Sequence, residues 1–197
     1  MTAGYLYVFP CAYEDLLKLG HSRDPLRRMY EINPRYYEFF DVDRAFLVMT
    51  ETVREAQQLE TRYHRALIEH GAPAPLTVND RAGYTEWYRG AYDALLLAAQ
   101  HFETLGYRVH RPLRPWLRQR LQANVGLLHS SGQMLTADEL AARGLAARAT
   151  TNQRRVADML DAYAAFGFDL REWLAQPLLD WHRAATAWAD GRVCHDD

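Results

Sequence analysis

Two short apolar runs near the N-terminus are followed by a change to helical spacing. Residues 5–9 are aromatic and β-branched, which suits one side of a pleated sheet, and residues 16–19 form a second short run closed by a glycine. Asp24 and Pro25 then combine an N-cap side chain with a proline at the first helical position. The pattern predicts two β-strands followed directly by a capped helix.

The next stretch predicts a third strand and a long helix. Residues 36–50 are rich in aromatic and β-branched side chains and are expected to be extended, with a buried strand at 45–49. Residues 53–70 have helical spacing, and Thr52 and Glu55 form a capping box at their start. We therefore expect an α+β fold with a small three-stranded sheet, mixed or antiparallel, flanked by helices.

One carboxylate lies inside the apolar stripe of the 53–70 helix. Val53, Ala56 and Glu60 follow one another at helical spacing, and His64 lies one turn later. A carboxylate on a core-facing stripe is costly to bury unless it has a hydrogen-bonding partner or binds a metal. Glu60 is therefore either a side chain at the edge of the core, hydrogen-bonded to His64 or to an arginine, or a metal ligand.

The second half of the chain predicts helices. A helix is expected at about 90–104, and a second at about 152–166. We predict an α/β domain at 1–107, a basic linker containing two prolines at 108–133, and an all-α region at 134–197.

Charge is distributed unevenly along the chain. The net charge is −2, which argues against a protein held on nucleic acid by bulk electrostatics alone. Residues 104–137 contain no Asp or Glu and carry a net charge of +5, which leaves −7 for the rest. This segment is either a solvated connection or a tether that contacts DNA phosphates. Its arginines are Arg108, Arg111, Arg114, Arg118 and Arg120.

The 152–166 helix begins with four polar or basic side chains: Asn152, Gln153, Arg154 and Arg155. Such a start is typical of the helix that a helix-turn-helix places in the major groove of DNA. The alternative is a plain packing unit, through which the chain would form a homo-oligomer or a larger assembly.

Cysteine and hydropathy patterns bear on the compartment. Cys11 and Cys194 are isolated from each other and lack the spacing of a zinc site, so free thiols in a reducing compartment, the cytoplasm or nucleus, are expected. No apolar run approaches the roughly 18 residues of a membrane helix, so no membrane partner is expected.

The N-terminal residues resemble the start of a GIY-YIG nuclease domain. The first half of the family's motif is matched around Tyr7, and the second half by the sequence Lys-Leu-Gly that begins at Lys18. Eleven residues separate Tyr7 from Lys18 and ten separate Lys18 from Arg28, which is normal for the family. Lys18 stands where the family has a second tyrosine, and a Lys-hydrophobic-Gly version is familiar in a phage and large-virus branch. The resemblance covers about residues 4–105.

This resemblance implies an active site of four residues and one metal ion. Tyr7, Lys18, Arg28 and Glu60 match the catalytic positions, with Glu60 as the metal ligand. A single carboxylate suits Mg²⁺ or Mn²⁺, which keep most of their waters. Arg28 is expected to hold the scissile phosphate, and Tyr7 to act as general base in the manner proposed for the family. Lys18 either lowers the pKa of Tyr7 through its charge or binds phosphate.

Five further residues are expected to support this site. His64 is a candidate partner that orients Glu60. Glu86 precedes a Trp-aromatic pair that the phage-like branch also has. It is either a second acidic member of the site or a structural charge at a helix N-terminus. The supporting residues are Tyr5, His21, Arg27, His64 and Glu86.

The sequence favours a metal-dependent endonuclease that acts on double-stranded DNA, with a C-terminal helical region for targeting or assembly. The alternative is a catalytically inactive protein of the same fold that serves as a DNA-binding regulator or as a structural component, for example of a virus particle. Tyr7, Arg28 and Glu60 at the family's spacing favour the nuclease, whereas Lys18 and the near-neutral charge favour the alternative.

Overall fold

The computed structural model describes residues 3–76, 78, 85–141 and 149–189. The chain divides into two compact units, residues 1–117 and residues 118–197. We call them the α/β unit and the helical unit. Cys11 is a buried free thiol, whereas Cys194 lies outside the described residues.

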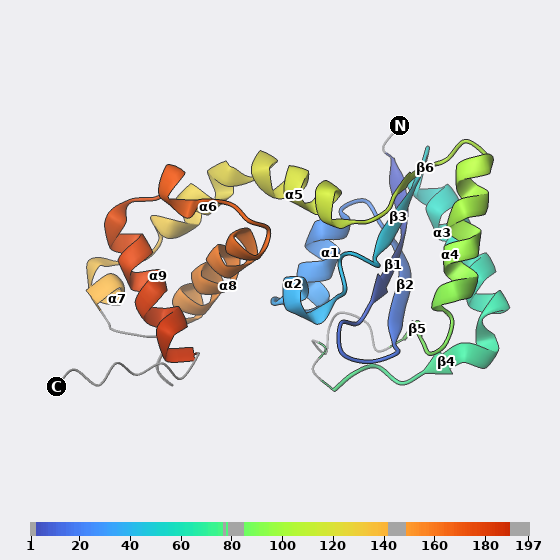
Figure 1. Ribbon diagram of the computed structural model, residues 1–197, viewed down its shortest axis with the longest axis horizontal. Coiled ribbons are helices and arrows are strands. Elements are labelled where there is room, and N and C mark those ends of the chain that lie inside the picture. Colours follow the sequence, from blue (N-terminus) through green and yellow to red (C-terminus); the bar gives the residue numbers. More distant parts are fainter. Residues whose placement is uncertain (1–2, 77, 79–84, 142–148, 190–197) are drawn as a thin grey trace. The chain divides into compact units, whose positions relative to one another are not determined.

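The α/β unit is built on one antiparallel sheet, with the strand order β4-β5-β2-β1-β3-β6 (Figure 1). The α+β class is confirmed, but the described sheet has six strands rather than the expected three. The three additional strands are two or three residues long, too short to show a period-2 pattern in the sequence. The strands are β1 Gly4–Pro10, β2 Leu17–Ser22, β3 Phe46–Thr50, β4 Gly71–Ala72, β5 Trp87–Tyr88 and β6 Arg108–His110.

Helices cover both faces of this sheet. The α/β unit contains α1 Pro25–Ile32, α2 Tyr36–Phe39, α3 Val53–Ala66, η1 Ile68–His70 and α4 Tyr92–Thr104. In Figure 1, α1 and α2 lie on one side of the strands, and α3 and α4 lie on the other. The predicted N-caps are confirmed, since Asp24 accepts from the Arg27 backbone N–H and Thr52 accepts from that of Glu55. The second half of the predicted capping box differs, because the Glu55 carboxylate accepts from the Glu51 backbone N–H.

One local expectation was wrong. Residues 36–39, expected to be extended, form the short helix α2, and the strand that follows begins only at Phe46. An ion pair between Arg35 and Glu38, three residues apart, supports this turn, with 2.7 Å between Arg35 Nη2 and Glu38 Oε1. Strand propensity of the aromatic residues is here outweighed by their packing, because Tyr36 is buried at the start of the turn.

The alternation along β1 divides the core into two layers. Leu6 and Val8 point to the side of α3 and α4, where they join Leu95 and Phe102 in a continuous apolar cluster. The intervening side chains point to the other side. Among them, the Phe9 ring lies 5.4 Å from that of Phe40, centroid to centroid. Tyr7 and Lys18 belong to this second layer, which is how the sheet brings polar groups into the interior.

The segment at 108–133 contains regular structure. It includes β6, α5 Arg114–Ala123 and α6 Val125–Gly132. Within the α/β unit, Arg114 makes a two-pronged contact with Asp43, at 2.7 and 2.8 Å, and Leu113 and Leu117 are buried. Pro115, at the second position of α5, fits a helix start, whereas Pro112 lies in the short connection between β6 and α5.

The helical unit has hydrogen bonds between its helices. It contains the rest of α5, α6, α7 Ala137–Ala141, α8 Thr151–Ala165, η2 Leu170–Glu172 and α9 Gln176–Ala189. The Tyr163 hydroxyl donates to the carbonyl of Leu121 at 2.7 Å, and His182 Nε2 lies 2.6 Å from Asp161 Oδ1. Across the described part of the chain, no helix has the length and apolar character needed to cross a membrane.

Candidate functional site

Tyr7 is held over a glycine on the neighbouring strand. It lies opposite Gly20 in the β1–β2 pairing and is only 1% exposed. A Cβ atom at position 20 would lie 2.2 Å from the Tyr7 hydroxyl oxygen, so only glycine leaves room for the ring. The glycine that ends the Lys-Leu-Gly sequence therefore has a steric cause in this fold.

Arg28 reaches the Tyr7 hydroxyl from α1. Its Nε donates to the Tyr7 oxygen at 3.3 Å, and its Nη1 lies 3.6 Å from Glu31 Oε2. Burial raises the pKa of Tyr7 to about 12, although the Arg28 charge and hydrogen bond act in the opposite direction. Tyr7 is thus a neutral phenol at neutral pH, and Arg28 keeps part of its guanidinium exposed.

The Lys18 side chain is completely buried, and its ammonium group has partners within the protein. Its Nζ donates to the carbonyl of Thr85, lies 3.3 Å from Glu86 Oε2 and sits 5.6 Å from the centre of the Trp87 ring. Burial lowers the pKa of Lys18, and Glu86 opposes that shift. Neither expected role fits this position. The buried ammonium does not reach a phosphate, and the cation that lowers the pKa of Tyr7 is Arg28.

Glu60 and Glu86 each place a carboxylate oxygen near the same imidazole nitrogen of His64. Glu60, 8% exposed, places its Oε2 2.6 Å from His21 Nδ1 and its Oε1 3.7 Å from His64 Nε2. The same His64 nitrogen is 3.4 Å from Glu86 Oε1. One donor atom from each of Glu60, His64 and Glu86 lies within 4.8 Å of the other two. Among the described residues, this is a group with the size and chemistry of a metal site.

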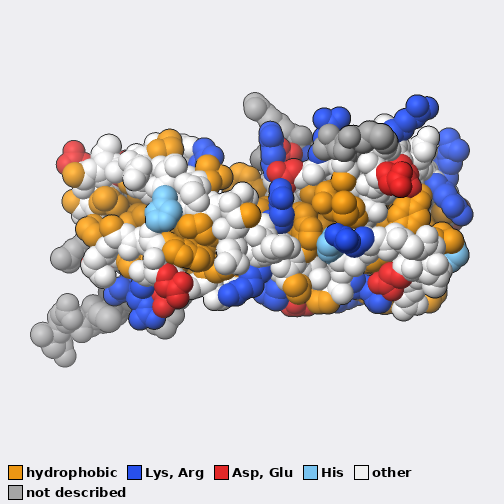
Figure 2. Space-filling model, turned by 90° about the horizontal axis from the view of Figure 1, so that it is seen from above, with side chains coloured by type: hydrophobic (Ala, Val, Ile, Leu, Met, Phe, Trp, Pro, Cys, Tyr) orange, Lys and Arg blue, Asp and Glu red, His pale blue; other side chains and the backbone are white. Residues whose placement is uncertain are grey.

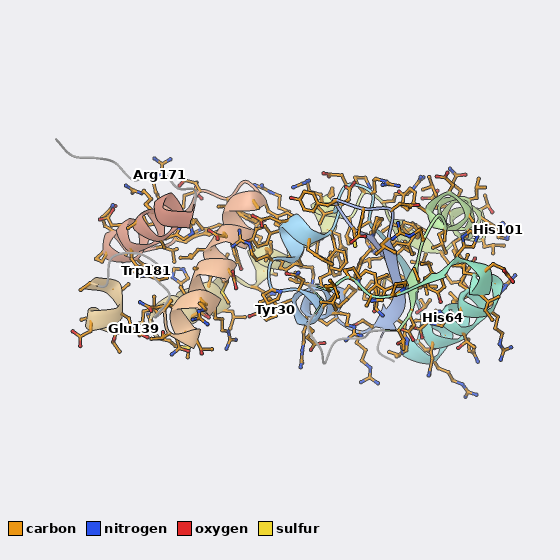
Figure 3. All side chains as sticks on the ribbon, turned by 90° about the horizontal axis from the view of Figure 1, so that it is seen from below. Tyr30, His64, His101, Glu139, Arg171 and Trp181 are labelled. Carbon is orange, nitrogen blue, oxygen red and sulfur yellow. The ribbon has the colours of Figure 1, made fainter. Side chains whose placement is uncertain are left out.

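The second nitrogen of His64 is also held. His64 projects from α3 (Figure 3), and its Nδ1 is hydrogen-bonded to the hydroxyl of Tyr88 on β5. Its Nε2 is buried without a hydrogen-bond partner. A buried, unsatisfied nitrogen between two carboxylates is costly, and a divalent cation would satisfy all three groups. The residues present therefore fit the metal that the sequence predicted for Glu60.

Glu86 adopts an uncommon backbone conformation. Its φ of 73° lies in the left-handed region, which costs a residue with a side chain on the order of 1 kcal/mol. Its carbonyl accepts from the Leu19 N–H at 3.2 Å, which continues the pairing of β5 with β2. The strained residue is thereby fixed against the strand that carries Lys18.

The charges of the two glutamates act on Tyr7 and on Lys18. The negative charges of Glu60 and Glu86 act on Tyr7, where they add to the burial that raises its pKa. They also act on Lys18, where both oppose the lowering of its pKa by burial. These charges therefore link Tyr7 and Lys18 electrostatically to the cluster of Glu60, His64 and Glu86.

Two predicted supporting residues lie elsewhere. The exposed Arg27 pairs with Glu31 on the surface of α1, at 2.9 Å, and the Tyr5 ring packs against Trp116 at 5.8 Å between centroids. His21, which was predicted as a supporting residue, does lie at the site, bonded to Glu60. Tyr88, bonded to His64, was not predicted, although the Trp-aromatic pair after Glu86 was the available signal.

The predicted DNA-contacting arginines are partly used within the fold. Arg111 lies 3.6 Å from Glu103, Arg114 binds Asp43, and Arg118 donates to the Phe166 carbonyl. On the face shown in Figure 2, Lys and Arg side chains are scattered among acidic and apolar ones. Arg108 and Arg120 are exposed. Contact of this segment with DNA stays a prediction.

The start of α8 separates the predicted DNA-reading residues. Asn152, Arg154 and Arg155 are exposed, whereas Gln153 is buried and closes a capping box with Thr150. Its amide nitrogen also donates to the Glu139 carbonyl at 2.9 Å, so Gln153 holds the helix start and does not face a ligand. Residues 142–148, between α7 and α8, lie outside the described residues, so the helix-turn-helix stays a prediction.

Comparison with known protein families assigns the first half of the chain. The T5orf172 domain matches residues 4–103, about half of the sequence. The chain belongs to the T5orf172 domain family. This is a phage-type, nuclease-associated domain related to the GIY-YIG and HNH-like endonucleases. Searches of curated proteins and of solved structures find no match.

The T5orf172 match contains every residue of the candidate site. It begins at β1, before Tyr7, and ends within α4, after Glu86 and Tyr88. The helical unit lies beyond the matched residues. The family therefore indicates a nuclease-like or DNA-binding function for the α/β unit.

Proposed function

We propose that the T5orf172 domain of this protein is a metal-dependent DNA endonuclease of GIY-YIG type. The observation that supports it is the hydrogen bond between Arg28 on α1 and Tyr7 on β1, together with the charge of Glu60 on α3, which acts on Tyr7. A guanidinium that binds phosphate and a metal ion held by a carboxylate both stabilise the charge that develops during phosphodiester hydrolysis.

In this proposal the residues have separate tasks. Arg28 binds the scissile phosphate through the exposed part of its guanidinium. Tyr7 is buried and its pKa is raised to about 12, so it keeps its proton at neutral pH. Its oxygen accepts from Arg28 and positions that guanidinium, which replaces the general-base role expected from the sequence. His21 orients Glu60. A divalent ion on Glu60 would stabilise negative charge on the leaving oxygen.

A plasmid-nicking assay tests the proposal. Purified full-length protein is incubated with supercoiled plasmid and Mg²⁺ or Mn²⁺, and we expect nicked circles from the wild type. Glu60→Gln and Arg28→Ala should each reduce the rate by about 100-fold or more, because each removes stabilisation of the transition state. Arg27→Ala is the matched control, since Arg27 lies beside Arg28 but is paired on the surface. Absence of nicking by wild type, or unchanged nicking in both site variants, would refute the proposal.

A second candidate is a DNA-binding regulator without catalysis. The complete burial of Lys18, at the position of the family's second tyrosine, favours it, because this side chain is withheld from a substrate. The exposed Arg154 and Arg155 would then provide contacts to double-stranded DNA. This candidate predicts a salt-dependent gel shift that is lost in the Arg154→Ala, Arg155→Ala double variant, with no nicking under any metal.

A further inference from the structure

We propose that Glu60, His64 and Glu86 together bind one divalent transition-metal ion, and that Lys18 positions Glu86 as a ligand. The inference deepens the proposed function, since Glu60 is common to both, and it rests on that function only for what the ion is used for. It replaces the single-carboxylate site expected from the sequence by a centre with two oxygens and one nitrogen.

In each carboxylate, one oxygen contacts a neighbouring side chain and the other faces His64 Nε2. Glu60 Oε2 is bound to His21 Nδ1 at 2.6 Å, and its Oε1 faces His64 Nε2 at 3.7 Å. Glu86 repeats this arrangement. Its Oε2 lies 3.3 Å from Lys18 Nζ and its Oε1 faces His64 Nε2 at 3.4 Å. Outer partners of this kind fix the orientation of metal ligands.

His64 completes the set with the nitrogen that has no partner. When Nδ1 carries the ring proton and donates it to the Tyr88 oxygen, Nε2 presents its lone pair to the two carboxylate oxygens. That buried lone pair has no hydrogen-bond donor among the described residues. Two oxygens and a lone pair directed at one point repel one another, and a cation removes the repulsion.

The donor set selects the class of ion. Mg²⁺ prefers oxygen ligands and retains its waters, whereas an imidazole nitrogen suits first-row transition metals. We therefore expect Mn²⁺ to bind at least tenfold more tightly than Mg²⁺.

Lys18 acts through Glu86 and not on a substrate. It is buried, it is bonded to the Thr85 carbonyl, and its remaining partner is Glu86. Glu86 is held there at a positive φ, with its carbonyl fixed on Leu19. The lysine that replaces a tyrosine of the GIY-YIG motif thus has a role in this chain as the positioning residue of a ligand.

Direct titration with Mn²⁺ tests the centre without any cleavage. Full-length protein freed of metal by EDTA and dialysis is titrated while the electron paramagnetic resonance signal of free Mn²⁺ is recorded. We expect one bound ion, with imidazole nitrogen modulation in pulsed spectra. Glu60→Gln, His64→Gln and Glu86→Gln should each weaken binding at least tenfold, and the nitrogen modulation should disappear in His64→Gln. Glu69→Gln, an exposed glutamate on η1, is the matched control.

Lys18→Met tests the positioning role. We expect a loss of Mn²⁺ affinity on the order of 10–100-fold with the nitrogen modulation retained, because His64 still binds while Glu86 is no longer held. A merely structural lysine would lower thermal stability and leave the affinity unchanged, and that result would overturn its role. Near-ultraviolet circular dichroism checks that each variant is folded.

The outcomes separate this inference from the nuclease proposal. Absence of Mn²⁺ binding, equal affinity for Mg²⁺, or wild-type affinity in both His64→Gln and Glu86→Gln would overturn the three-ligand centre. If wild type nicks DNA while these two variants bind Mn²⁺ normally, the nuclease stands and the centre fails. If the variants lose Mn²⁺ and wild type does not nick DNA, the centre stands and the nuclease fails.

Discussion

Lys18 in the α/β unit and Gln153 in the helical unit are both buried polar side chains, yet they serve different ends. Lys18 carries a charge whose partners lie 67 and 68 residues away, and it stands at the edge of a cluster in which His64 Nε2 is unsatisfied. Gln153 is neutral, and its amide closes a capping box and a bond to Glu139.

This contrast separates buried polar groups that define structure from those that serve a function. A group such as Gln153, whose donors and acceptors are matched by nearby backbone, specifies where a helix begins. Ionisable groups that are buried with atoms left over, as around His64, cost stability and are retained where chemistry needs them.

Removing the carboxylate of Glu86 should be the most destabilising change. Glu86→Ala leaves the buried Lys18 ammonium without its counter-charge, which costs about 3–5 kcal/mol in the free energy of unfolding. Urea denaturation measures this. Adding Lys18→Met to Glu86→Ala should recover most of the loss, since no unpaired charge remains. A cost equal to that of Glu69→Ala would show that Lys18 does not depend on Glu86.

Glycine-to-alanine changes should have opposite signs in the two units. Gly20→Ala places a Cβ 2.2 Å from the Tyr7 hydroxyl and should destabilise by about 3 kcal/mol through overpacking. Gly126→Ala, on α6, meets nothing within 4 Å and should stabilise by about 0.5–1 kcal/mol, because alanine favours a helix. Thermal unfolding of both variants checks the pair, and equal effects would contradict the close contact at Tyr7.

Alkaline pH should destabilise both units through buried tyrosines. Burial raises the pKa of Tyr7 and of Tyr163 to about 12, from an ordinary value of 10. Between these values the folded chain keeps each proton while the unfolded chain releases it. The free energy of unfolding therefore falls as pH rises from 10 to 12, by about 2–3 kcal/mol for each tyrosine.

Denaturant titrations over this pH range, with Phe substitutions, test the assignment. Tyr7→Phe and Tyr163→Phe should each flatten the dependence, and Tyr13→Phe, at an exposed position, should not. If the free energy of unfolding falls as steeply with pH in both Tyr7→Phe and Tyr163→Phe as in the wild type, other groups release the protons.

The smallest effect is expected at the start of α8. Gln153→Ala removes the capping-box side chain and should cost about 1 kcal/mol, whereas Asn152→Ala, at the exposed neighbouring position, should cost less than half of that. Neither change should alter Mn²⁺ binding, since both residues belong to the helical unit. Comparable losses in the two variants would contradict the structural role given to Gln153.

The sequence predicted elements whose signals are local. Asp24 with Pro25 located α1, and Thr52 with Glu55 located α3, because a cap depends on residues within one turn. The same locality misled the prediction at residues 36–39, where aromatic side chains suggested a strand.

Contacts between residues far apart in the sequence could not be predicted from local patterns. Periodicity singled out Glu60 as a costly carboxylate, but it could not identify His21 as the partner of that carboxylate, 39 residues away. The two-residue strand β5 joins Glu86 to Lys18 and Tyr88 to His64, and no pattern marks so short a strand. The sequence thus identified most candidate residues one at a time, whereas the contacts between them became known only from the structure.

The contact between Tyr7 and Gly20 also has a consequence for variation at these two positions. The Tyr7 ring occupies the volume in which any other residue at position 20 would place its Cβ atom. The side chains at positions 7 and 20 therefore compete for the same space. We expect exchanges to be tolerated only as a pair, with a smaller residue at 7 accompanying a larger one at 20. Relatives that keep the aromatic residue at position 7 should keep the glycine at position 20. Relatives with a smaller residue at position 7 should tolerate other residues at position 20.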